Sequence, residues 1–279
     1  MHMLSALDAT FIYLESEHSP MAIGAVYVID AEDAPDDFSY QAWHALVKSR
    51  MGLSAVFRQR LVEVPLDLSF PYWIRDPDFE LDAHLPRLKL PAPGGLAELM
   101  NLVSNTWGQV LDRKRPLWDI TFVEGLDSVP GLSEGSFALV TRVHHAAVDG
   151  KASAEIMTAL LDPTPAIREV EVEDSWEPED IPSNLGVITR SWSKVGSKAV
   201  ELAGFVGKAA VDAASLQLDK RLEKIEPPPR LLSAPACLFN RPVDSVRTFW
   251  GRNFDFERIQ AIRKAVAGVT VNDVVLAVC

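Results

Sequence analysis

The sequence has 279 residues, of which 48% are hydrophobic and 24% charged, so it can bury a sizeable core and disorder is excluded as its default state. The formal net charge of -12 at pH 7 repels phosphate backbones and argues against a nucleic-acid partner. Two distant cysteines, Cys237 and Cys279, make neither a disulfide framework nor a metal site, and they predict a reducing, cytoplasmic setting. The N-terminus lacks the features of a signal peptide, and no uncharged apolar run reaches the about 18 residues of a membrane span.

The first part of the chain alternates strand and helix patterns. Apolar, β-branched runs bounded by turn residues predict buried strands, and apolar residues at helical spacing predict amphipathic helices between them. In chain order these elements are strand 22–29, helix 38–51, strands 56–65 and 72–74, helix 96–111, strands 117–123 and 137–143, and helix 151–161. Such interleaving predicts an α/β fold.

The middle of the chain has a different composition. Residues 162–182 are rich in proline and acidic side chains without apolar periodicity, which predicts an exposed linker. Residues 187–224 have helical spacing until the prolines at 227–229 end the pattern. This lysine-bearing helix either lies on an anionic membrane surface or packs as a crossover helix on its own domain, and the acidic residues within it favour the second interpretation.

A new unit begins near residue 236. It contains a predicted strand at 248–254, a helix at 256–266 that Gly268 ends, and a last helix after the N-cap residue Thr270. This helix is still apolar when the sequence stops at Cys279, which is typical of a fragment. The predicted divisions are 1–165 for a first domain, 166–235 for the linker and crossover helix, and 236–279 for the opening of a second domain.

The residues that carry chemistry form the segment His144-His145-x-x-x-Asp149-Gly150, between a predicted strand and a predicted helix. A histidine can take a proton at neutral pH and return it, and acyl transfer to an alcohol requires such a base because a hydroxyl is a poor nucleophile. Adjacent histidines alone are usually a loop or surface pair. The aspartate and glycine at these offsets favour a catalytic site, in which Asp149 fixes local geometry and Gly150 permits a tight turn.

This HHxxxDG segment is the signature of the CoA-dependent acyltransferase superfamily, and further segments resemble bacterial wax ester synthase/diacylglycerol acyltransferases. In family order they are SPMAIG at 19–24, RQRL at 58–61, DPDF at 76–79, PLW at 116–118, FNRP at 239–242 and NDVVLA at 272–277. One departure is Ala22, where the family usually has histidine. The resemblance extends from residue 4 to residue 279.

The resemblance implies a fold like that of chloramphenicol acetyltransferase, a mixed sheet flanked by helices, followed by the start of a second similar half. In the family the active site lies in a channel between the two halves, so this chain would lack much of one wall and is expected to be inactive alone. The second histidine of the signature is the general base, which corresponds to His145. The aspartate is mainly a structural salt-bridge partner, which corresponds to Asp149, and His144 is expected to be structural as well.

The lesser motifs have two interpretations each. Pro116, Leu117 and Trp118 are expected to shape the acyl channel by packing, with direct substrate contact as the less favoured alternative. Asn272 either donates a hydrogen bond to the developing oxyanion or bonds to backbone at a helix start. Asp273 is expected to be structural, and Arg241 either pairs with Asp149 or is solvated.

The resemblance therefore predicts an O-acyltransferase that moves a long-chain acyl group from acyl-CoA to diacylglycerol or a fatty alcohol, forming triacylglycerol or wax ester. Acyl-CoA is a co-substrate, and neither a metal nor a permanently bound cofactor is expected. The alternatives are a condensation-type acyltransferase on carrier-bound thioesters and a non-catalytic half that binds lipid or a companion chain. The expected location is cytoplasmic, with a peripheral position at the inner membrane or at lipid droplets as a further prediction.

Overall fold

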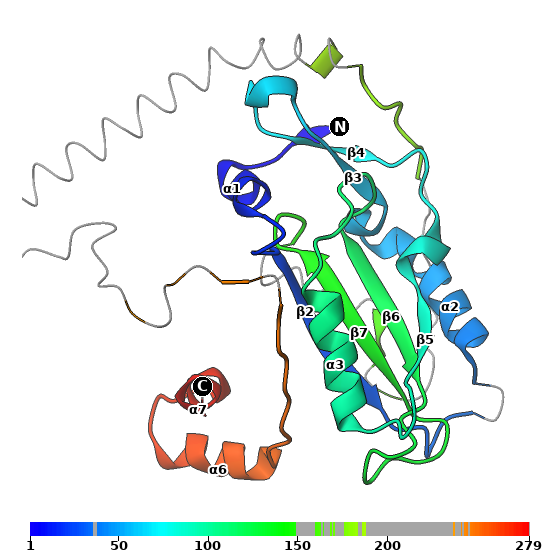
Figure 1. Ribbon diagram of the computed structural model, residues 1–279, viewed down its shortest axis with the longest axis vertical. Helices are drawn as coiled ribbons and strands as arrows, with labels where there is room; N and C mark the ends of the chain where they lie inside the picture. The colour runs from blue at the N-terminus through cyan, green and yellow to red at the C-terminus, as the bar shows by residue number, and fades with distance from the viewer. Residues whose placement is uncertain are drawn as a thin grey trace, which may run out of the picture. The chain divides into compact units, whose positions relative to one another are not determined.

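The computed structural model describes residues 1–35, 38–148 and 246–278, with short stretches and single residues between 160 and 244. The chain divides into two compact units, Met1–Arg247 and Thr248–Cys279, and each is described by itself (Figure 1). Among the described residues, no helix is long and apolar enough to cross a membrane.

A mixed four-stranded sheet forms the centre of the first unit (Figure 1). Its strands, in spatial order, are β2 (Ala22–Ile29), β7 (Phe137–His144), β6 (Trp118–Glu124) and β5 (Arg87–Lys89). β7 is antiparallel to both of its neighbours, whereas β5 runs parallel to β6. The register pairs Ala22 with His144, so the end of β7 lies beside the start of β2.

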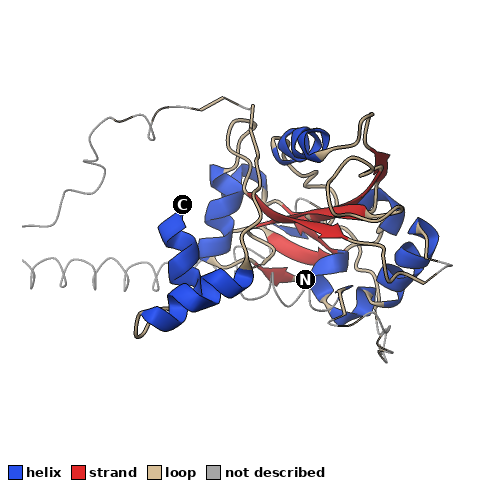
Figure 2. Ribbon diagram, turned by 90° about the horizontal axis from the view of Figure 1, so that it is seen from below, coloured by secondary structure: helices blue, strands red, loops and turns tan. Residues whose placement is uncertain are grey.

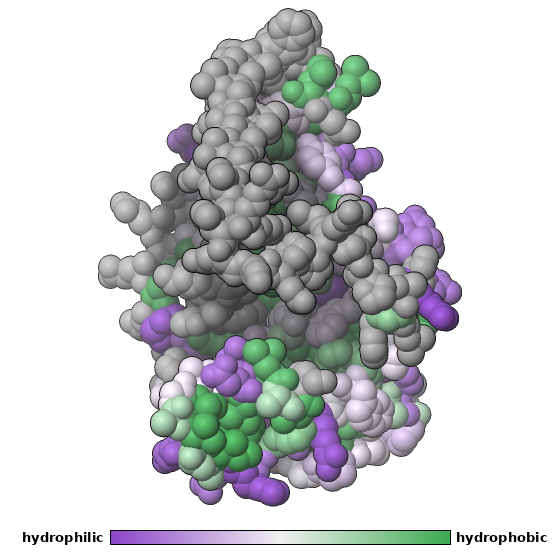
Figure 3. Space-filling view, turned by 90° about the vertical axis from the view of Figure 1, so that its left-hand side faces the viewer, coloured by the Kyte–Doolittle hydropathy of each residue, from purple (hydrophilic) through white to green (hydrophobic). Residues whose placement is uncertain are grey.

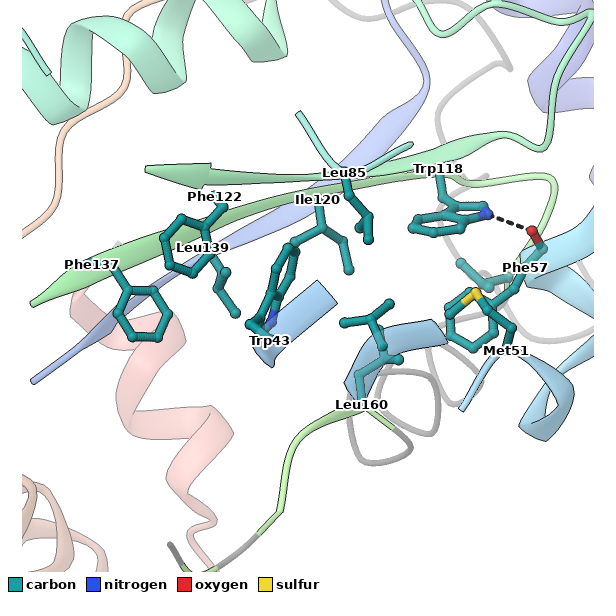
Figure 4. Close-up of a cluster of buried hydrophobic side chains, with 12 residues drawn as sticks. Trp43, Met51, Phe57, Leu85, Trp118, Ile120, Phe122, Phe137, Leu139 and Leu160 are labelled. Carbon is teal, nitrogen blue, oxygen red and sulfur yellow. Dashed lines mark hydrogen bonds between the residues drawn. The ribbon is translucent and has the colours of Figure 1, made fainter. Parts of the chain in front are cut away.

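Side chains alternate between the two faces of this sheet, as the pleat of a strand requires. One face packs against helix α2 (Tyr40–Ser49), which begins at the N-cap Ser39, and forms the main core (Figure 4). This core consists of Trp43, Val47, Met51, Phe57, Leu85, Trp118, Ile120, Phe122, Phe137, Leu139, Val148 and Leu160. Burying each large apolar side chain contributes about 1.5–3 kcal/mol, so this cluster is a principal source of the fold's stability.

The second face of the sheet packs against helix α3 (Leu96–Trp107), so the strands form a layer lined by helices (Figure 2). Glu98 caps this helix by accepting the Gly95 N–H at 2.9 Å. Trp107, at its end, lies against Gly24 of β2. A Cβ added at Gly24 would stand 2.1 Å from the carbonyl oxygen of Thr141 and 3.1 Å from the Trp107 ring, which accounts for the glycine that ends the SPMAIG segment.

A smaller antiparallel sheet has the order β1 (His2–Met3), β4 (Tyr72–Arg75), β3 (Gln59–Val62). Helix α1 (Ala6–Leu14) follows β1 directly, and its N-cap Ser5 accepts the Asp8 N–H at 3.1 Å. Ala9 and Ile12 bury its inner face, with 0% and 2% of their surface exposed. The remaining short helical turns are Met51–Leu53, Ala55–Arg58, Pro65–Asp67 and Leu81–His84.

The described part of the second unit consists of two helices, α6 (Phe256–Ala265) and α7 (Val271–Val278). Gly268 lies between them with φ +81°, a left-handed conformation that favours glycine. Val275, Leu276 and Val278 remain exposed, and apolar surface gathers over these helices in Figure 3.

Most of the predicted elements are confirmed, but not all. The predicted strand 248–254 is wrong, because the described residues of this unit include no neighbouring strand with which it could pair. The first residues of predicted strand 56–65 form a 3-10 turn instead, since strand pairing with β4 begins only at Gln59. Helix α1 and strand β5 were not predicted. The predicted helix 187–224 and nearly all of 151–161 lie outside the described residues.

The close approach at Gly24 makes a testable prediction. Gly24→Ala should lower the free energy of unfolding by about 1–3 kcal/mol, because the methyl group overlaps the Thr141 carbonyl and forces β2 away from β7. Urea unfolding followed by circular dichroism measures the change. Gly186→Ala is the control, since among the described residues its added Cβ would meet only the Ser183 hydroxyl, at 3.3 Å. Equal midpoints for both variants would contradict the packing argument.

Candidate active site

His144 and His145 lie where β7 ends, and backbone hydrogen bonds fix both. The His144 N–H donates to the Leu117 carbonyl at 2.8 Å, just before β6, and the His145 N–H donates to the Met21 carbonyl at 2.8 Å, just before β2. The Ala147 N–H closes the following turn by donating to the His144 carbonyl at 2.9 Å. Three segments of the chain therefore converge on the double histidine.

Both nitrogens of the His144 ring lie beside a protein group. It is fully buried, and its Nδ1 accepts the Ala146 N–H at 3.0 Å. Because Nδ1 is an acceptor, the neutral ring carries its proton on Nε2. Nε2 lies 3.3 Å from Oε1 of Glu15, an ion-pair separation without an aligned hydrogen bond to any described residue. His144 is thus engaged inside the protein and has no nitrogen free for a substrate.

Glu15 is a buried carboxylate at the end of α1, with 3% of its side chain exposed. Its Oε1 accepts the Met21 N–H at 3.1 Å, and its Oε2 accepts from Arg113 at 3.1 and 3.2 Å. Burial alone raises the pKa of this carboxyl, but the adjacent His144 ring and the hydrogen bonds from the Met21 N–H and Arg113 outweigh burial and hold the pKa below its usual value. Glu15 is therefore ionised at neutral pH.

His145 has a different environment from its neighbour. Its half-buried ring stacks on Phe11 of α1, with the ring centroids 4.0 Å apart and an interplanar angle of 12°. Neither ring nitrogen hydrogen-bonds to any residue in the described part of the chain. In this respect the two histidines differ, since the Nδ1 of His144 accepts the Ala146 N–H.

Pro116, Leu117 and Trp118 lie at the start of β6, beside the end of β7. Pro116 forms an isolated antiparallel β-bridge with Arg60. Leu117 is buried, and its carbonyl accepts the His144 N–H. Trp118 is buried too, and its indole N–H donates to the Phe57 carbonyl at 2.9 Å (Figure 4). These contacts support the packing role over direct substrate contact.

Of the other predicted site residues, Asn272 and Asp273 belong to the second unit, which is described by itself. Asn272 is exposed in the second unit, so an oxyanion role stays a prediction. Asp273 accepts both the backbone N–H and the hydroxyl of Thr270 at 2.7 Å, an arrangement that caps α7. Arg241 is exposed, and Asp149 and Gly150 lie outside the described residues.

Sequence reasoning missed Phe11, Glu15 and Arg113. The only signal for Glu15 was an acidic residue that closes the apolar run at 11–14, and nothing local connects it to His144. In the part of the chain that the structure describes, no group of three His, Cys, Asp or Glu side chains is arranged to hold a metal ion.

Comparison with known proteins identifies the protein family to which this chain belongs. The chain belongs to the wax ester synthase/diacylglycerol acyltransferase family, whose catalytic-domain model matches residues 4–275. A putative diacylglycerol O-acyltransferase of Mycobacterium tuberculosis is 35% identical over 285 residues, which cover 99% of this chain and 57% of that protein. A second one from this organism is 30% identical, covering 100% of this chain and 53% of that protein.

A solved structure supports the same family and the same fold. The wax ester synthase/diacylglycerol acyltransferase from Marinobacter aquaeolei VT8 is 30% identical and superimposes with a TM-score of 0.62, covering 99% of this chain and 58% of that chain. The predicted family and the α/β fold class with a mixed sheet are therefore confirmed. The chain spans a little more than half the length of these relatives.

The lowered pKa of Glu15 predicts a pH dependence of stability. A carboxyl whose pKa is depressed by folding stabilises the protein above its unfolded pKa of about 4.3, and this stability is lost as the pH falls through the lower folded value. Glu15→Gln should lower the free energy of unfolding by roughly 3 kcal/mol at pH 7, and the difference from wild type should shrink in strong acid.

Urea unfolding at a series of pH values measures this difference. Glu63→Gln is the matched control, because Glu63 pairs with the same Arg113 at 2.8 Å but is largely exposed, so its loss should cost less than about 1 kcal/mol. A Glu15→Gln deficit that stays constant or grows on acidification would contradict the assigned ionisation.

Proposed function

We propose that the protein transfers a long-chain acyl group from acyl-CoA to the hydroxyl of diacylglycerol or a fatty alcohol, forming triacylglycerol or a wax ester. Membership of the family and the names of its relatives support this reaction. The single observation that supports a base at this site is the division of roles in the double histidine. His144 is buried and engaged, whereas His145 keeps its ring nitrogens unbonded among the described residues.

The proposed mechanism uses His145 as a general base and then as a general acid. A ring nitrogen of His145 takes the hydroxyl proton as the alcohol oxygen attacks the thioester carbonyl. The tetrahedral intermediate collapses, the C–S bond breaks, and the protonated His145 returns the proton to the CoA thiolate. The products are an ester and free CoA, and the histidine regains its starting state. Acyl-CoA is a co-substrate in this scheme, and no metal or bound cofactor takes part.

The roles of the remaining residues are part of the proposal. Asn272 would donate to the oxyanion, while Asp149 would hold the turn after the double histidine, through Arg241 or backbone groups. Because the chain spans a little more than half of its relatives' length, the facing wall of the substrate channel would come from sequence that corresponds to their remainder. Two reactants must be held in register for efficient transfer, so activity would require that wall. A peripheral position at a membrane or lipid droplet would bring the apolar acceptor to the channel.

The test compares histidine variants in a protein extended to the relatives' full length, with labelled palmitoyl-CoA and either diacylglycerol or hexadecanol. His145→Ala should lower the rate of ester formation at least about a hundredfold while the circular dichroism spectrum is unchanged, since a general base contributes about 10²–10⁴ in rate. His144→Ala should mainly lower the melting temperature, because it leaves Glu15 buried with one partner fewer.

His18→Ala is the control, since His18 is an exposed histidine outside β7. A folded His145→Ala protein that keeps more than a tenth of the wild-type rate would refute the assignment of the base. Absence of ester formation by the wild type with both acceptors would refute the proposed reaction itself.

A further inference from the structure

Helix α1 contacts both histidines of the signature, through two residues one turn apart. Phe11 stacks on the His145 ring, and Glu15, four residues later, pairs with the His144 ring. Side chains at i and i+4 lie on one face of a helix, so a single face of α1 lies against the pair. We propose that α1 is the positioning element of the catalytic base, with Glu15 acting through His144 and Phe11 acting on His145 directly. This inference rests on the proposed function in taking His145 as the base.

Glu15 acts on the backbone that carries His145. The Nε2–H of His144 faces the Glu15 carboxylate, and this leaves Nδ1 free to accept the Ala146 N–H. Without the carboxylate, the buried Nε2–H would have no negative charge facing it, and the ring would gain by turning toward another acceptor. The Ala146 N–H would then lose its acceptor, and the turn that fixes His145 would loosen. Glu15 is thus a positioning residue, because it touches the partner of the base rather than the base.

Phe11 sets the plane of the His145 ring. The lone pair of an imidazole nitrogen lies in the ring plane, so a substrate hydroxyl must approach the ring edge to give up its proton. The stacked Phe11 covers one face of the ring and holds that plane nearly parallel to its own, at 12°. The His145 ring has no hydrogen bond to another described residue, so the Phe11 stack is the ring contact that the structure shows for it.

The helix itself is firmly anchored. Before it, the Leu4 N–H donates to the Pro71 carbonyl at 2.9 Å, and Ser5 caps its first turn. At its end, Arg113 donates to the Ile12 carbonyl at 2.6 Å as well as to Glu15. A site residue is held accurately only when its supporting residues are themselves fixed, and α1 meets this condition.

The first test needs no substrate, and it uses side-chain nitrogen and carbon-bound proton NMR of the histidines in the 279-residue chain. In the wild type His144 should show the Nε2–H tautomer, and the His145 ring protons should be shifted by the Phe11 ring. Glu15→Leu should shift the His144 Nδ1 resonance and the Ala146 amide resonance, because the hydrogen bond between these two groups weakens. Phe11→Leu should remove the ring-current shift of His145 and leave the His144 tautomer unchanged.

The second test measures kinetics in the full-length form. Phe11→Leu should lower kcat about tenfold to a hundredfold, because misplacing a catalytic group by about 1 Å can cost a hundredfold, while the KM for acyl-CoA changes little. Phe11→Tyr keeps the aromatic face and should retain the wild-type kcat. Leu14→Ala is the matched control on the same helix, since Leu14 is 61% exposed, and it should leave kcat unchanged.

The outcomes separate the two proposals. A Glu15→Leu protein that keeps the wild-type His144 Nδ1 and Ala146 amide resonances, or a Phe11→Leu protein that keeps the wild-type kcat, would overturn the positioning role. If Glu15→Leu fails to fold, the Phe11 variants decide the question by themselves. If the wild type forms no ester, the proposed reaction fails, whereas the NMR result on α1 still supports or overturns the contacts that it reports.

Discussion

A carboxylate buried away from water must be paired, and Glu15 meets this requirement where α1, β2 and β7 converge. Its Oε1 accepts a hydrogen bond from the Met21 N–H and faces the His144 ring, and its Oε2 accepts a hydrogen bond from Arg113. Removing any one partner would leave a charge or a buried N–H uncompensated, which costs several kcal/mol. The local structure around the HHxxxDG segment therefore depends on this one side chain, although it lies far from the segment in the sequence.

The same pairing explains why two adjacent histidines can have different roles. Successive residues at the end of a strand point to opposite sides, so only one of the two rings can face Glu15. His144 does so, inside the protein, and its ring then serves the backbone of the turn. His145 stacks on Phe11 instead, and its ring nitrogens have no hydrogen bond to another described residue. The two adjacent histidines of the signature therefore differ in their surroundings, with a buried ring followed by a half-buried ring that stacks on Phe11.

Much of this fold follows from local patterns, and the exceptions have physical causes. Strands 22–29 and 137–143 were predictable because both are apolar, β-branched runs, although only β7 is buried along most of its length and β2, at the edge of the sheet, is half-buried. Residues 248–254 have the alternation of a strand, but pairing with a neighbour decides whether a strand forms, and a single sequence does not contain that information. Helix α1 was missed because it is short and apolar on its exposed face as well, where Leu7 and Leu14 break the expected amphipathic pattern.

For the site, the motif predicted the position of the double histidine, and the likeness to a family predicted which one is the base. It did not predict Phe11, Glu15 or Arg113, because contacts between distant segments depend on the tertiary fold. The division between His144 and His145 is tested most directly by their reactivity toward diethyl pyrocarbonate, located by fragment-ion mass spectrometry of the folded and urea-unfolded chain. The account predicts that His145 is modified in the folded protein while His144 is protected, and that both react after unfolding. Modification of His144 as fast as His145 in the folded protein would contradict it.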